Sequence, residues 1–127
     1  MIWAGPLSNW IAACDFIVAL EPEVVVPGHG PICDVEAVKN MKGYFEHLRD
    51  EARARFDAGM GWREAARDIP IKEYAHWTDP ERVVANVYSL YKQWNPDIPH
   101  APPPMLFAEM NAYRKEHLER HGCGHAH

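Results

Sequence analysis

The chain has 127 residues, of which 24% are charged and 47% hydrophobic, and its formal net charge is −5 with neutral histidines. This size and composition are typical of one globular domain and exclude a largely disordered chain. The acidic balance and the interleaving of acidic with basic residues exclude a nucleic-acid-binding protein, because phosphate backbones select a concentrated basic surface.

The sequence carries no signal that would direct it to a membrane. No apolar run approaches the roughly 20 residues that a membrane-spanning helix needs. The start, Met1 to Pro6, lacks the basic segment and apolar stretch of a signal peptide. The cysteines, Cys14, Cys33 and Cys123, are odd in number and scattered, which is typical of reduced thiols. We therefore expect a cytoplasmic protein that binds neither membrane nor nucleic acid.

The first part of the chain predicts a helix followed by a strand. Apolar residues recur at helical spacing up to Leu20, and Ser8 is the predicted N-cap. The Glu-Pro pair at 21–22 ends this helix, since the residue before a proline avoids the α region. The three valines at 24–26 then predict a strand, and their continuous apolar character favours burial on both faces. Residues 28–31, Gly-His-Gly-Pro, predict a tight loop after it.

Four more helices are predicted further along. A long amphipathic helix begins at Asp34, its N-cap, and ends before Gly59. A short helix follows over 62–68. Thr78 and Glu81 have capping-box spacing and predict the start of the next helix.

The C-terminal part predicts a division of the chain into unequal regions. The main region covers 1–94. Residues 95–104 contain five prolines and are expected to form an extended linker. A last helix is predicted over 105–120, and residues 121–127 form a tail rich in His and Cys.

These elements make a mostly helical α/β protein with one convincing strand. A lone buried strand would leave its backbone N–H and C=O groups unpaired. Three explanations stay open: residues 2–3 add a second strand, the strand pairs with another copy, or the missing sheet belongs to a longer protein.

His29 is the most informative single residue. It lies between two glycines, directly after the predicted strand, where open α/β sheets place their ligands. A histidine in this position can bind a metal or exchange a proton. The alternative is a loop histidine satisfied by local hydrogen bonds.

The motif around His29 resembles a known family. The strand with Pro-Gly-His-Gly-Pro at 27–31, the preceding Gly-Pro-Leu-Ser-Asn-Trp at 5–10 and the later segment at 74–82 resemble the C-terminal region of metallo-β-lactamase-fold hydrolases, a superfamily that includes glyoxalase II-like enzymes. The resemblance covers about residues 3–94. It implies the C-terminal portion of an αββα fold, a zinc-ligand position at His29, and relatives that hydrolyse an ester, thioester or amide.

The chain also departs from that family. The family's His-x-His-x-Asp-His motif does not occur in this sequence. Because a catalytic zinc normally needs three protein ligands, His29 alone gives an incomplete zinc site. The resemblance therefore implies a truncated hydrolase segment without activity alone. The alternatives are a self-associating small metal-binding protein and a non-catalytic binding or scaffold module.

The tail and one cysteine add further candidate metal ligands. His121, Cys123, His125 and His127 together could chelate a transition metal, or they could be a terminus that binds metal adventitiously. Cys33 lies four residues after His29 and could supply sulfur, although a buried inert thiol is the alternative. The unpaired strand predicts a homodimer or higher oligomer, because one apolar patch can cover its own copy.

Overall fold

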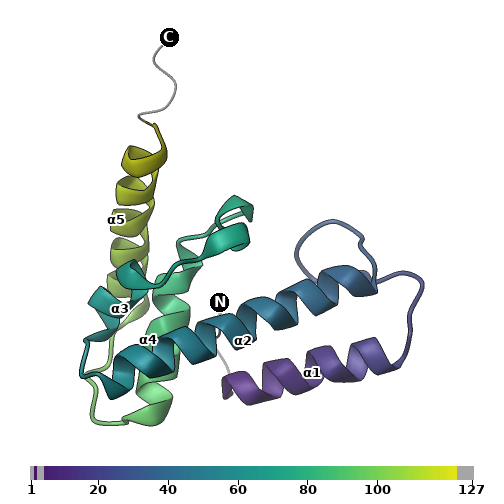
Figure 1. Ribbon diagram of the computed structural model, residues 1–127, viewed down its shortest axis with the longest axis horizontal. Helices are drawn as coiled ribbons and strands as arrows, with labels where there is room; N and C mark the ends of the chain where they lie inside the picture. Colours follow the sequence, from purple (N-terminus) through teal and green to yellow (C-terminus); the bar gives the residue numbers. More distant parts are fainter. Residues whose placement is uncertain (1, 3–4, 123–127) are drawn as a thin grey trace.

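The computed structural model describes residue 2 and residues 5–122, and this part of the chain is mostly helical (Figure 1). The predicted mostly helical class is confirmed. None of the described helices is long and apolar enough to cross a membrane. In chain order the elements are α1 (Leu7–Ala19), α2 (Val35–Asp57), α3 (Trp62–Asp68), the 3-10 helix η1 (Lys72–His76), α4 (Arg82–Trp94) and α5 (Pro103–Gly122).

The helices pack around α4. Helices α1 and α2 lie side by side and run in opposite directions, joined by a long loop (Figure 1). Helix α4 contacts α2, α3 and α5. Eight of its thirteen residues are buried, so α4 supplies the centre of the core. The side chains of Val83, Val84 and Val87 are fully enclosed, and each such burial contributes roughly 1.5–3 kcal/mol to folding.

Both predicted boundaries of the long helix α2 are confirmed. The Asp34 carboxylate accepts a hydrogen bond from the Ala37 N–H at 3.2 Å, which satisfies one of the unpaired donors of the first turn. Gly59 follows the helix with φ +81°, in the left-handed region that glycine adopts without steric cost.

The two other predicted caps are wrong. Helix α1 begins after Pro6, and no side chain caps it, because Ser8 already lies within the first turn. At α4 the cap residue is Glu81, and again no side chain makes a capping bond. Asp79 has φ +58° and its carboxylate accepts from Arg82 at 2.6 Å, while an oxygen of Glu81 lies 3.7 Å from Arg114. These contacts replace the reciprocal bonds of a capping box.

The prediction of a strand buried on both faces is also wrong. Within the described residues, the only strand-like pairing is one antiparallel bridge between Val25 and Cys33, with both N···O distances 2.9 Å. The side chains of Val24 and Val26 are 60% and 74% exposed. Ile2 extends no sheet, because its N–H donates to the Asn86 side chain at 2.9 Å. No second strand among the described residues covers the valines, so they stay at the surface.

The proline-rich segment is held against α4. The Lys92 ammonium donates to the carbonyl oxygens of Pro96 and Ile98, and the Ala101 N–H donates to the Tyr88 hydroxyl at 2.8 Å. Helix α5 then starts at Pro103, two residues earlier than predicted. Three of its apolar residues, Leu106, Met110 and Tyr113, are buried.

Candidate functional site

His29 lies on the exposed loop between α1 and α2 and forms part of the wall of a cavity of about 710 Å³. The loop can turn tightly here because Gly30 has φ +121°, a conformation that side-chain-bearing residues rarely adopt. The cavity is bounded by α1, α2, the segment around η1 and the start of α4. We call it the aromatic groove and define it by Trp10, His29, Tyr44, Phe45, Tyr74, Trp77 and Arg82.

Three of these aromatic side chains form one cluster. The ring centroids of Tyr74 and Trp77 are 4.9 Å apart at an interplanar angle of 77°, and those of Tyr44 and Tyr74 are 5.2 Å apart at 74°. These are the edge-to-face arrangements that aromatic rings prefer. Tyr74 approaches α2 closely at Gly43, since a Cβ there would lie 3.1 Å from the Tyr74 hydroxyl. The missing side chain leaves room for Tyr74 to lie over α2.

Polar groups fix the inner side of the groove. The amide Nδ2 of Asn86 donates to the Tyr44 hydroxyl at 3.1 Å, and Asn86 itself is buried. Burial raises the pKa of Tyr44 to about 12, so its hydroxyl stays protonated at neutral pH. At the edge of the groove, the Arg82 Nη2 donates to the Asp79 carboxylate at 2.6 Å.

The described residues do not form a complete metal site. Among them there is no group of three or more His, Cys, Asp or Glu side chains that could share one ion. Cys33 pairs with Val25 through its backbone only, and its thiol is free and partly buried. A zinc ion at His29 would therefore need ligands from outside the described residues.

The second candidate metal group cannot be assembled from the described structure. Cys123, His125 and His127 lie outside the described residues, and the side chain of His121 is also outside them. The metal-binding tail stays a prediction.

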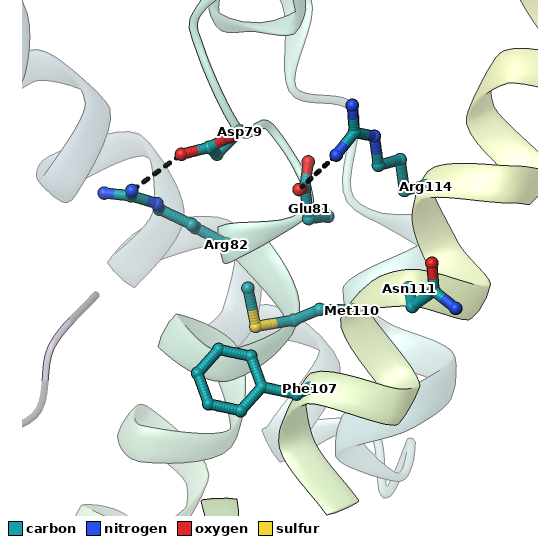
Figure 2. Close-up of a pocket in the computed structure, with 7 residues that line it drawn as sticks. All are labelled: Asp79, Glu81, Arg82, Phe107, Met110, Asn111 and Arg114. Carbon is teal, nitrogen blue, oxygen red and sulfur yellow. Dashed lines mark hydrogen bonds and ion pairs between the residues drawn. The ribbon is translucent and has the colours of Figure 1, made fainter. Parts of the chain in front are cut away.

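A smaller cavity of about 300 Å³ lies between the start of α4 and α5 (Figure 2). Figure 2 shows its two ion pairs, Asp79 with Arg82 and Glu81 with Arg114, above the side chains of Phe107 and Met110. One carboxylate oxygen of Glu81 is fully buried without a hydrogen-bond partner. Because that oxygen is closed off from solvent, the cavity does not present it to a ligand. We interpret the Glu81–Arg114 pair as a contact between the start of α4 and α5, whereas the Asp79–Arg82 pair is local to the start of α4.

Sequence reasoning did not single out Tyr44, and it marked Tyr74 and Arg82 only as the ends of the segment 74–82 that carries the family resemblance. One signal was present: Asn86 interrupts the valine-rich buried stretch of α4, and a buried amide needs hydrogen-bond partners. Its partner Tyr44 lies on α2, 42 residues away in sequence, so the pair forms only when the two helices pack.

No protein-family model matches this chain, and neither a curated protein nor a solved structure matches it. The resemblance at residues 27–31 and the zinc-ligand position of His29 therefore stay predictions.

Proposed function

We propose that this chain supplies the C-terminal part of a metallo-β-lactamase αββα hydrolase and has no hydrolase activity alone. The observation that carries the proposal is that His29, the residue at the family's metal-ligand position, lies on the wall of the aromatic groove. A ligand in the groove would place a reacting bond near the residue that the motif marks for metal binding.

The exposed apolar surface supports the same proposal. Val24, Val26 and Ile32 are between 60% and 74% exposed, and Phe16 and Leu20 on the neighbouring helix are 66% and 63% exposed. The remaining layers of a sandwich fold would cover such a surface and pair the valine backbone. The two free thiols described, Cys14 and Cys33, support our proposal of a reducing, cytoplasmic location.

Self-association is a second candidate, and the same surface favours it. A second copy could cover Val24 and Val26 in place of the missing layers, as a symmetric dimer does when one patch meets itself. The two candidates differ in assembly: the dimer forms from this chain alone, whereas the segment needs a different polypeptide.

Hydrolysis assays on the purified chain test whether the segment is inactive alone. We expect the chain to show no His29-dependent turnover of β-lactam, thioester or lactone substrates, even with added Zn²⁺. The His29→Ala variant should therefore give the same rates as the unmodified chain. The reason is the incomplete ligand set among the described residues. A robust rate that depends on His29 would overturn the proposal of an inactive segment.

The reading frame upstream of the Met1 codon tests the family assignment. The proposal expects an open frame that encodes His-x-His-x-Asp-His. An upstream stop codon in frame, with no separate gene that encodes the motif nearby, would contradict it.

A further inference from the structure

We propose that the aromatic groove binds an aromatic ring that carries a carbonyl group, with the ring against Tyr74 and Trp77 and the carbonyl oxygen accepting a hydrogen bond from Arg82. The inference names a substrate class for the proposed hydrolase, and its catalytic meaning rests on that proposal. Binding itself requires no hydrolysis, so it can be tested separately.

The size and composition of the groove suit a small organic ligand. Its volume of about 710 Å³ lies within the roughly 300–1,000 Å³ that is usual for such sites. Most side chains that face it are apolar, and a few polar groups stand at its margin. This is the general composition of sites that bury an apolar ligand and orient it by a small number of hydrogen bonds.

The exposed ring surfaces favour an aromatic occupant over an aliphatic one. Trp77 is 39% exposed although it contacts both Tyr44 and Tyr74, so part of its ring faces the open groove. A further ring can extend this cluster by edge-to-face or offset contacts. Such a contact strengthens binding by about 2- to 10-fold beyond the burial of apolar area.

Arg82 supplies the polar end of the site. A guanidinium has five N–H donors, and the hydrogen bond to Asp79 is the one side-chain hydrogen bond that Arg82 makes within the described residues. Its side chain is 48% exposed, so its other donors can reach a ligand. Asp79 balances the positive charge, which favours a neutral carbonyl oxygen over a carboxylate.

Binding of matched small probes tests the proposal. We would titrate the chain with 2-phenylacetamide, with 2-cyclohexylacetamide, which lacks the aromatic ring, and with 2-phenylethanol, which lacks the carbonyl. Indole N–H shifts in NMR spectra report the site, because Trp77 lies in the groove. We expect 2-phenylacetamide to bind at least about 5-fold more tightly than either analogue.

Variants assign the contacts. Trp77→Leu should weaken 2-phenylacetamide binding by about 5- to 10-fold, whereas the control Trp94→Leu should not, since Trp94 packs against Phe56 and Tyr91 outside the groove. Arg82→Met, which keeps an extended stem and removes every N–H donor, should abolish the preference for 2-phenylacetamide over 2-phenylethanol. Thermal unfolding would establish that each variant is folded.

Each outcome decides one of the two proposals. Equal binding of the cyclohexyl and phenyl probes, no binding of either, or equal weakening by Trp77→Leu and Trp94→Leu would overturn the groove inference. The hydrolase proposal would then still stand on its upstream-frame test. Ring-selective binding together with an upstream frame that lacks the His-rich motif would refute only the hydrolase assignment.

Discussion

The C-terminal helices and the N-terminal segment of this protein differ in how far their apolar side chains are exposed to solvent. In the region of α3, α4 and α5, apolar side chains are mostly buried in a shared core. In residues 7–34, α1 buries only Leu7 and Cys14. Of ten exposed large apolar side chains in the described structure, six lie between residues 10 and 32.

The difference shows that helix formation and burial need not accompany each other. Helix α1 packs along α2, yet Phe16 and Leu20 remain largely exposed. Apolar surface left in water contributes nothing to the stability of this chain and is available to another polypeptide. A partner polypeptide or a second copy would therefore bury the most apolar surface by binding to the N-terminal segment.

The largest expected effect contrasts a leucine of the buried core, Leu48 on α2, with a leucine of the N-terminal segment, Leu20. Leu48 is 0% exposed and Leu20 is 63% exposed. Leu48→Ala should lower the free energy of unfolding by about 3 kcal/mol, because it removes buried contacts and leaves a cavity. Leu20→Ala should change it by less than about 0.5 kcal/mol. Urea titrations measure both values, and similar costs for the two substitutions would remove the contrast.

The next effect concerns Tyr44, on the helix that joins the two regions. Burial raises its pKa from 10.0 to about 12. In the unfolded chain this tyrosine ionises near pH 10, whereas in the folded chain it stays protonated up to about pH 12. Its contribution to stability is therefore complete below pH 10 and is lost as the pH rises to 12. The free energy of unfolding should fall by about 3 kcal/mol over this range.

Tyr44→Phe is the matched variant, because it removes the ionising hydroxyl and keeps the ring. Its stability should fall less steeply between pH 10 and pH 12 than that of the unmodified chain. If the free energy of unfolding had the same pH dependence in both proteins, folding would not raise the pKa of Tyr44.

Val26 tests whether the exposed N-terminal surface joins two copies. If it does, Val26→Lys should weaken the assembly about 10-fold or more, since a lysine charge would have to be desolvated at the contact. The control is Ala58→Lys, which introduces the same charge at the exposed C-terminal end of α2. Light scattering over a dilution series measures both. A monomer of 14.5 kDa at every concentration would contradict self-association.

The smallest effect concerns the attachment of α5 to α3. Arg63 Nε donates to Glu109 at 2.7 Å and Arg67 lies at 3.3 Å from the same carboxylate. The hydrogen bond from Arg63 lowers the pKa of Glu109, so its contribution to stability is present above pH 4.5 and is lost as the pH falls through the lowered value.

Glu109→Gln should therefore cost up to about 1 kcal/mol at pH 7, because the carboxylate is only partly buried. The cost should shrink as the pH falls through the lowered pKa of Glu109, because the unmodified side chain then becomes protonated. Thermal unfolding over a series of pH values from 7 downwards measures it. Glu36→Gln, which removes a pair with Lys39 at the surface, should have a smaller effect.

The helices could be predicted from sequence because their signals are local. The spacing of Val83, Val84, Val87 and Leu90 and the Asp34 cap each act within a few residues, and the structure agrees with them. The valines at 24–26 were misjudged because strand pairing depends on partners that a local pattern does not contain. The aromatic groove was missed for a related reason, since Tyr44, Tyr74 and Asn86 meet only through tertiary packing.

The close approach of Tyr74 to Gly43 has a consequence for protein engineering. A glycine inside a helix lowers stability by about 1 kcal/mol relative to alanine, so Gly43→Ala would be an obvious choice for raising the melting temperature of the chain. Yet the added Cβ would lie 3.1 Å from the Tyr74 hydroxyl, which would have to move by a few tenths of an ångström. At this residue, the gain in helix stability therefore depends on how readily Tyr74 can shift within the aromatic groove.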